Sequence, residues 1–294
     1  MEQPLFSIVI PTHNRAAQLP AAIQSVLDQS YPHWELIVVD DGSTDGTAST
    51  VAAFTDPRIR YHYQENRQLN GARNSGVGLA RGEFLGFLDD DDLLQPGHLA
   101  VLHAAMREDK FQHPIYRSGL ILRGKSEERG VNYVNGQDAL AQYWAHPAGL
   151  FGMLIRRDLL RARPFDEDLL LLDDFLWLSA VLVEHPLYQV AAHTAVVNLH
   201  PAQRSATYLD EQRLQDNIRR LAAAYNLPGV PQRVPFEFYR RQVVHQHLHF
   251  TRQLERNGQL RAALGSWWKA LSYARWGDWR ELGATLGKVF FALF

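Results

Sequence analysis

The sequence contains no cysteine. Disulfide bonds, thiolate nucleophiles and cysteine-ligated zinc are therefore excluded. No uncharged apolar run reaches the ~18 residues that a membrane-spanning helix needs; the longest apolar stretch, residues 169–183, contains Asp173 and Asp174. The start of the chain carries no basic leader followed by a small-residue cleavage site. These absences predict a cytoplasmic protein, either free in solution or peripheral at the inner face of the membrane.

The sequence also lacks a large excess of charge of either sign, because 30 Lys and Arg residues stand against 32 Asp and Glu residues. Nucleic acid is therefore not expected as a partner. Charge is unevenly distributed, however: residues 231–294 contain ten basic and four acidic side chains, a local net charge of +6. The same segment is rich in Trp and Phe. Two interpretations stay open: these aromatic residues pack in a core or a homodimer interface, or they form a basic, aromatic surface that contacts membrane lipid.

Apolar, β-branched runs alternate with helical patterns over the first hundred residues. The runs 6–10, 35–39, 59–63 and 84–88 have the pattern of buried strands, and residues 16–29, 47–54 and 72–80 have the pattern of helices. This alternation predicts an α/β fold with a mostly parallel sheet flanked by helices. From about residue 208 the pattern is helical to the end, which predicts a C-terminal helical extension.

Polar clusters follow three of the expected strands, at residues 11–15, 40–41 and 89–92. Ligands of open α/β sheets bind at the carboxyl ends of strands, so we expect the three clusters to share one crevice. The third cluster is four consecutive aspartates, whose mutual repulsion a divalent cation relieves; oxygen ligands suit Mg²⁺ or Mn²⁺. If the run is extended, Asp89 and Asp91 point to one side and Asp90 and Asp92 to the other. The alternative is that Asp92 is the N-cap of a helix.

Four motifs in this part of the chain resemble those of the family 2 glycosyltransferases. They are SIVIPTHNR at residues 7–15, LIVVDDGSTD at 36–45, GARNSG at 71–76 and GEFLGFLDDDD at 82–92. The resemblance implies a GT-A fold, a nucleotide-sugar donor, a Mn²⁺ or Mg²⁺ cofactor and transfer with inversion. It implies a GT-A domain over residues 1–205, divided into a nucleotide-sugar half (1–97) and an acceptor-side half (98–205), and the extension over 206–294.

The resemblance also implies roles for individual residues. The nucleotide-sugar site is assigned to Pro11, Thr12, His13, Asn14, Arg15, Asp40, Asp41, Arg73, Asn74, Asp89 and Asp90. Asp41 accepts a hydrogen bond from the base imide, Asp40 supports its strand end, Asp90 meets the ribose, and Asp91 ligates the metal that bridges the diphosphate. His13 stands where relatives often have Tyr, which bears on the identity of the base.

Inverting transfer needs a further carboxylate that is not tied to the metal. The stretch LDDFLWL at residues 172–178 resembles the family's acidic element, so Asp174 is the expected general base and Asp173 the alternative. The competing interpretation is a helix N-terminus that favours acidic residues. Further along, His200 is assigned to the metal shell and Arg204 to the leaving phosphate, although a single His after a strand is also compatible with a structural role.

Other interpretations are weaker. A haloacid dehalogenase-type phosphatase needs a nucleophilic Asp after the first strand, and a nucleotidyltransferase needs a Gly-rich, Arg-containing loop there; neither is present. His245 and His249 share a helix face without a carboxylate at matching spacing, and we interpret them as structural. The resemblance implies a UDP-sugar donor and a carbohydrate or lipid-linked acceptor, in cell-surface polysaccharide or glycolipid assembly. A non-catalytic nucleotide-sugar binding module is the alternative.

Overall fold

The structure is a computed structural model. It describes residues 3–124, 126–169, 172–199 and 210–274, together with residues 278, 282–283 and 285. The chain divides into two compact units. The first comprises residues 1–139, 148–177 and 184–199, and the second comprises residues 140–147, 178–183 and 200–294. The predicted domain boundary at 205/206 falls in the segment 200–209, outside the described residues, and stays a prediction.

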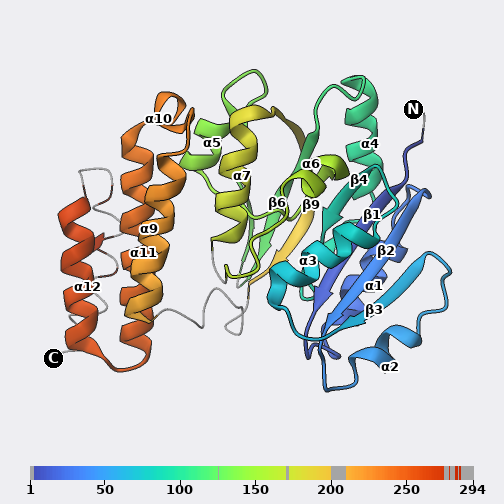
Figure 1. The fold of residues 1–294 in the computed structure, drawn as a ribbon, viewed down its shortest axis with the longest axis horizontal. Helices are drawn as coiled ribbons and strands as arrows, with labels where there is room; N and C mark the ends of the chain where they lie inside the picture. The colour runs from blue at the N-terminus through green and yellow to red at the C-terminus, as the bar shows by residue number, and fades with distance from the viewer. Residues whose placement is uncertain are drawn as a thin grey trace. The chain divides into compact units, whose positions relative to one another are not determined.

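Nine strands of the described residues form one sheet in the first unit (Figure 1). They are β1 (Phe6–Thr12), β2 (Trp34–Asp41), β3 (Ile59–Gln64), β4 (Phe84–Phe87), β5 (Leu93–Leu94), β6 (Ile115–Arg123), β7 (Glu127–Arg129), β8 (Met153–Arg156) and β9 (Leu187–Asn198). Their order is β3-β2-β1-β4-β8-β6-β9-β5, with β7 beside β6. The longest ladders, β1–β2, β2–β3 and β6–β9, are parallel, while β8 pairs antiparallel with β4 and β6. The predicted α/β fold with a mostly parallel sheet is confirmed.

Helices cover both faces of the N-terminal strands, which explains why β1 is buried along its whole length. α1 (Leu19–Leu27) and α4 (His98–Glu108) contribute to the same apolar cluster as Phe6, Ile8 and Ile10 of β1. α3 (Gln68–Leu79) packs on the opposite face, where Gly76 lies directly against Val9. This helix begins four residues earlier than the sequence pattern predicts. The other described helices that precede the C-terminal helices are α2 (Thr47–Ala52), α5 (Ala139–Ala145), α6 (Arg157–Ala162) and α7 (Asp173–Glu184).

The second unit is helical, as the sequence predicts. Its C-terminal helices are α9 (Glu211–Tyr225), α10 (Val230–Arg233), α11 (Phe236–Arg256) and α12 (Leu260–Tyr273), and α9, α11 and α12 lie side by side (Figure 1). Asp210 caps α9 by accepting a hydrogen bond from the Arg213 amide at 2.8 Å. Trp267 is buried with Leu248, whereas Trp268 is 59% exposed. None of the described helices is long and apolar enough to cross a membrane.

Candidate functional site

The three polar clusters meet at one edge of the sheet. β1 runs parallel to β2 and β4, Thr12 lies in register with Asp40, and Phe87 at the end of β4 lies in register with Val9. The segments that follow the three strands therefore leave the same edge of the sheet. Thr12 Oγ1 donates to Asp90 Oδ2 at 2.7 Å. The His13 ring Nδ1 lies 2.8 Å from the backbone oxygen of Asp41. These contacts confirm that the clusters are neighbours, as their positions after parallel strands predict.

The loop after β1 is fastened to the loop after β2. Asn14 has a left-handed backbone (φ 53°), its amide donates to Ser43 Oγ at 2.8 Å, and its Oδ1 accepts from the Thr44 amide at 2.8 Å. Pro11 is buried, whereas the His13 side chain is exposed at this edge. Arg15 lies close enough to Asp90 to lower the pKa of its carboxyl group, against the larger effect of burial. The two loops therefore hold His13 at the surface of the site.

Asp40 and Asp41 have different surroundings, although both are buried. Asp40 accepts hydrogen bonds from the Ser43 amide at 2.8 Å and from the Tyr61 hydroxyl at 2.6 Å, which fits the predicted support of the strand end. The Oδ1 atom of Asp41 accepts from Gln64 Nε2 at 2.7 Å and from the Arg67 amide at 2.8 Å. Two donors on one oxygen hold the Asp41 carboxylate in a defined orientation.

The four aspartates after β4 form a turn, so the alternation of side chains that an extended run would give does not apply. The Asp92 amide donates to the Asp89 backbone oxygen at 3.1 Å. The N-cap interpretation of Asp92 is wrong, because the next residues form the strand β5. Asp92 instead accepts a hydrogen bond from the Asn198 amide of β9 at 2.8 Å, and the Asn198 side chain donates to the Asp91 backbone oxygen at 2.6 Å. Strand β9 thus shapes the turn.

Two of the four carboxyl groups have strongly raised pKa values. Burial raises the pKa of Asp90 to about 7, with repulsion from Asp91 and Asp89 adding to the effect and the Thr12 hydrogen bond opposing it. Burial raises the pKa of Asp92 to about 8, with repulsion from Asp89 next in size. Such shifts are typical of carboxylates gathered where a cation or a ligand compensates them.

Among the described residues, no group of three His, Asp or Glu side chains forms a ready-made metal site. Mg²⁺ and Mn²⁺ are commonly held by one or two carboxylates and completed by substrate phosphates and water. The Asp89 side chain is 47% exposed, and Asp91 is partly exposed beside it. The carboxylate oxygens of this turn therefore suit a metal ion whose remaining ligands come from a diphosphate and water.

Arg73 of α3 brings the acidic pair Asp173–Asp174 to the site. Its Nη1 atom lies 2.6 Å from Asp173 Oδ2 and 2.6 Å from Asp174 Oδ1. Its Nη2 atom lies 4.0 Å from Asp89 Oδ1. Burial opposes the charge of Arg73, but the attraction of Asp174, Asp173 and Asp89 outweighs burial and raises the pKa of the guanidinium. The two carboxylates begin α7, so the helix N-terminus stabilises them as well.

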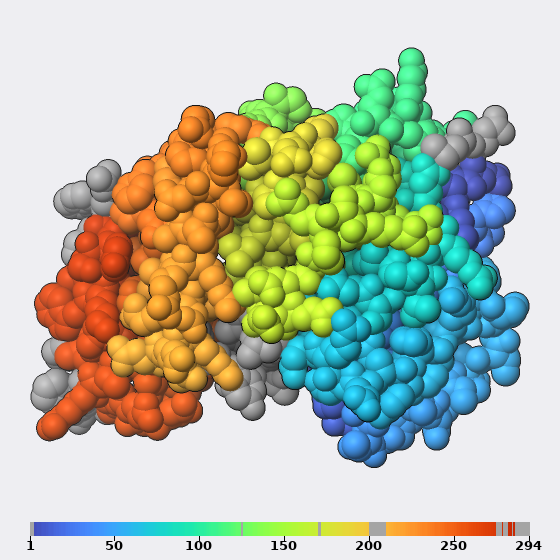
Figure 2. All heavy atoms as spheres, in the orientation of Figure 1, coloured from blue at the N-terminus to red at the C-terminus, as the bar shows by residue number. Residues whose placement is uncertain are grey.

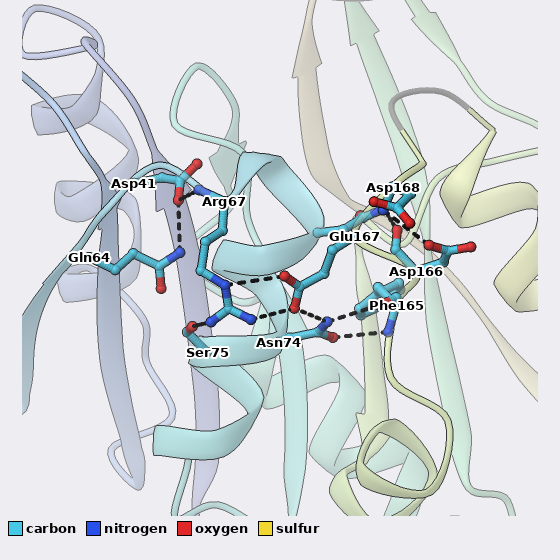
Figure 3. Close-up of polar contacts among 10 residues, drawn as sticks. Asp41, Gln64, Arg67, Asn74, Ser75, Phe165, Asp166, Glu167 and Asp168 are labelled. Atoms are coloured by element: carbon cyan, nitrogen blue, oxygen red, sulfur yellow. Dashed lines mark hydrogen bonds and ion pairs between the residues drawn. The ribbon is translucent and has the colours of Figure 1, made fainter.

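α3 also holds the segment that leads to this acidic pair. Asn74 Nδ2 donates to the Phe165 backbone oxygen at 2.9 Å, and the Phe165 amide donates back to Asn74 Oδ1 at 2.9 Å. The Arg67 guanidinium binds the Glu167 carboxylate with two hydrogen bonds, at 2.6 and 3.2 Å (Figure 3). Arg67, Glu167 and Asn198 were not predicted as site residues. No local pattern marks them, since their partners lie far away in the chain.

Several other residues singled out in the sequence are not part of the described site. His200 and Arg204 lie outside the described residues. His245 and His249 lie on α11, in the second unit, and no described group of metal-ligating side chains includes them. The aromatic residues Trp276, Trp279, Phe290, Phe291 and Phe294 of the tail are likewise outside the described residues.

Comparison with known proteins identifies the family of the chain. Residues 7–161, just over half of the sequence, match the model of Glycosyl transferase family 2. The chain belongs to this family. The match spans the three strand-end clusters and Arg73, so the resemblance of the four motifs is confirmed.

Curated relatives of this family 2 chain include two enzymes with lipid diphosphates in their names. It is 32% identical over 188 residues to the GalNAc(5)-diNAcBac-PP-undecaprenol beta-1,3-glucosyltransferase of Campylobacter jejuni, a match covering 60% of this chain and 59% of the relative. It is 43% identical over 94 residues to the UDP-Glc:alpha-D-GlcNAc-diphosphoundecaprenol beta-1,3-glucosyltransferase WfgD of Escherichia coli, covering 32% of this chain and 37% of the relative. The chain thus spans less than two thirds of the length of either relative.

Solved structures share the GT-A fold of this family 2 chain. Residues 1–349 of Staphylococcus aureus TarS in complex with UDP-GlcNAc superpose with a TM-score of 0.64 and 18% identity, covering 99% of this chain and 82% of that one. The Pyrobaculum calidifontis mannosyltransferase PcManGT, in complex with GDP-Man and Mn²⁺, gives a TM-score of 0.63 and 21% identity, covering 99% of this chain and 81% of that one. The predicted GT-A fold is confirmed.

Proposed function

We propose that this family 2 chain is an inverting glycosyltransferase that moves a sugar from a nucleotide-diphosphate donor to an acceptor hydroxyl. One observation carries the proposal: the buried Arg73 binds the pair Asp173–Asp174 and also lies 4.0 Å from Asp89 in the acidic turn. The candidate base Asp174 and the acidic turn, which suits a cation bound to a diphosphate, therefore both lie beside the guanidinium of Arg73.

In the proposed reaction, Asp174 accepts the proton of the acceptor hydroxyl while the hydroxyl oxygen forms a bond to the anomeric carbon. The bond between that carbon and the diphosphate oxygen breaks, and its electron pair leaves with the diphosphate. Because attack comes from the face opposite the leaving group, the anomeric configuration inverts. Asp173 is the alternative base. A bound Mn²⁺ or Mg²⁺ supplies positive charge against the charge that develops on the diphosphate.

We assign the residues of the acidic turn, and the metal that they would hold, to binding of the nucleotide-sugar donor. Asp91 is the proposed protein ligand of the metal, with His200 as a second ligand, and we assign Asp90 to the ribose. Arg204 is assigned to the leaving phosphate. The named complex of PcManGT with GDP-Man and Mn²⁺ supports a metal-assisted donor site on this fold.

A UDP-sugar is the favoured donor. Asp41 offers a carboxylate that accepts a hydrogen bond from a ring N–H beside a carbonyl group, which uracil has at N3 and guanine at N1. The names of related structures include both UDP-GlcNAc and GDP-Man, so the fold supports a nucleotide-sugar and leaves the base to local residues. His13, exposed beside Asp41, is the residue that we expect to contact the base.

The acceptor that we propose is a carbohydrate hydroxyl, free or lipid-linked, in cell-surface polysaccharide or glycolipid assembly. The names of the two curated relatives, which include diphosphoundecaprenol acceptors, support this class. α12 exposes Arg261, Trp268 and Lys269, a basic and aromatic surface suited to anionic lipid at the inner face of the membrane. Sedimentation with anionic vesicles tests this contact; self-association by light scattering without vesicle binding would favour the homodimer.

The function is tested by thermal unfolding with UDP, GDP, dTDP and CMP, each with and without Mn²⁺. A ligand that binds only the native state raises the melting temperature. We expect a rise with UDP that depends on Mn²⁺. Nucleotide binding without hydrolysis of UDP-sugars or transfer to any acceptor would favour the non-catalytic binding module, and no rise with any nucleotide would contradict the donor site.

A further inference from the structure

Glu167 is joined to Arg67 across the site by a two-point ion pair. Arg67 Nη2 lies 2.6 Å from Glu167 Oε1 and Arg67 Nε lies 3.2 Å from Glu167 Oε2 (Figure 3). Asn74 Nδ2 adds a third donor, 3.1 Å from Glu167 Oε1. Glu167 belongs to the segment between α6 and α7, and that segment lies against α3 (Figure 2). The pair thus connects the start of α3 with the segment that ends in the acidic pair.

The surface of α3 has room for this ion pair only because residue 71 is glycine. A Cβ atom at Gly71 would clash with Arg67 Cβ and would lie 3.3 Å from Glu167 Oε2. Any other residue at position 71 would therefore displace Arg67. Glycine at this position lets Arg67 lie close against the first turn of α3, beside the Glu167 carboxylate.

The backbone of Arg67 is part of the nucleotide site. Its amide donates to Asp41 Oδ1 at 2.8 Å, beside the hydrogen bond from Gln64. The following residue, Gln68, has a left-handed backbone with φ 63°. A non-glycine residue keeps such a conformation only where its surroundings determine it. The Arg67–Glu167 pair supplies such a determinant at the very residue whose amide orients Asp41.

We propose that Glu167 is a positioning residue for recognition of the nucleotide base. By holding the Arg67 side chain, it fixes the amide that orients the Asp41 carboxylate. An isolated surface ion pair contributes little to the free energy of unfolding, and the Arg67 and Glu167 side chains are 50% and 34% exposed. This pair, however, has two hydrogen bonds of defined direction, and Gly71 lets Arg67 lie close against α3. We therefore expect the pair to affect the orientation of Arg67 more than the overall stability of the chain. The inference rests on the proposed function, since it takes Asp41 as the acceptor for the base.

The experiment measures dissociation constants of UDP and CDP in the presence of Mn²⁺, by calorimetry, for the full chain. The uracil of UDP carries the N3–H donor whose hydrogen bond Asp41 is proposed to accept, and N3 of the cytosine in CDP carries no hydrogen. For Glu167→Gln we expect UDP to bind about fivefold more weakly, a loss on the scale of one ion pair, while CDP binding and the melting temperature stay close to wild type. Arg67→Gln should give the same loss, and the double variant should be no worse than either single variant.

Two further variants separate this role from a general effect of charge or folding. Glu127→Gln removes a carboxylate from the exposed pair with Arg123 and should leave both affinities unchanged. Gly71→Ala displaces Arg67 without changing charge and should reproduce the selective loss of UDP affinity. Equal losses for UDP and CDP, or additive effects in the double variant, would overturn the inference. If wild type binds none of the nucleotides in the thermal unfolding test, the proposed function fails; if wild type prefers UDP over CDP and Glu167→Gln keeps that preference, only the inference fails.

Discussion

Arg73 and Asp174 form an ion pair of 2.6 Å that Arg73 shares with Asp173 through the same nitrogen. The Arg73 side chain is only 5% exposed. The rings of Phe87 and Phe165 each lie 5.6 Å from its guanidinium carbon, which confines it. A cation held this firmly keeps two adjacent carboxylates in fixed places, which the proposed proton acceptor requires.

Arg73→Met should destabilise the chain and abolish transfer. Removing the cation leaves two partly buried carboxylates unpaired, and breaking a buried ion pair costs about 3–5 kcal/mol. Arg73→Lys keeps the charge but loses the planar fork, so we expect a folded protein whose kcat falls about tenfold or more. Urea unfolding and transfer assays measure both effects. Arg156→Gln, which breaks the exposed pair with Asp158, is the matched control and should change neither quantity appreciably.

Asp174→Asn should separate binding from chemistry. We expect UDP and Mn²⁺ to bind as in wild type, while transfer falls by about 10²–10⁴-fold, the usual contribution of a general base. Asp173→Asn should reduce transfer less, because the base would remain. Single-turnover transfer assays beside calorimetry provide the comparison. Normal turnover by Asp174→Asn, with loss in Asp173→Asn, would move the base to Asp173.

Asp91→Asn should remove the dependence of nucleotide binding on Mn²⁺. Loss of one charged oxygen ligand weakens a site that one or two carboxylates hold. The expected result is that UDP no longer raises the melting temperature further when Mn²⁺ is added. Asp28→Asn, at a position outside the acidic turn, is the control. A Mn²⁺-dependent rise equal to wild type in Asp91→Asn would show that another residue holds the ion.

Stability without metal should fall as pH rises from about 4 to about 8. The pKa values of Asp90 and Asp92 are raised to about 7 and about 8, so the folded state binds protons more tightly than the unfolded chain. Their contribution is therefore complete below the ordinary Asp pKa of about 4 and is lost as pH rises from there to the folded pKa values, by up to about 1.4 kcal/mol per pH unit for each group, with little further change above them. Urea unfolding across this range measures the fall. Asp92→Asn, which cannot ionise, should make it shallower, and added Mn²⁺ should oppose it.

Acidification should destabilise the chain through His98. This residue is buried, and its Nδ1 atom is hydrogen-bonded to Thr194 Oγ1 at 2.8 Å. Burial lowers the pKa of the imidazole to about 3. Below the ordinary histidine pKa of about 6.5, the unfolded chain takes up a proton that the folded state does not, so stability falls with falling pH. His98→Gln should reduce this dependence in urea unfolding between about pH 7 and pH 5. His33→Gln, at an exposed position, is the matched control.

Much of the nucleotide-side edge follows from local pattern. The runs before Pro11, Asp40 and Asp89 are short and apolar, which predicts buried parallel strands. Because parallel strands have their carboxyl ends at the same edge of a sheet, the sequence predicts that the three polar clusters lie close together. The shape of the acidic turn was not. Its hydrogen bonds come from Asn198, on a strand more than a hundred residues away, and local spacing contains no information about that partner.

The sequence by itself determined β1 to β4 and α1 to α3, the helical C-terminal part and the membership in glycosyl transferase family 2, but not the short strand β5. These features depend on periodicity and short motifs, which are local. Only the tertiary structure decided that Arg73 binds Asp173 and Asp174 and that Arg67 binds Glu167. Each pair joins segments about a hundred residues apart, and the packing of α3 against the segment before α7 selects the partners. The electrostatics of the site are therefore a property of the fold.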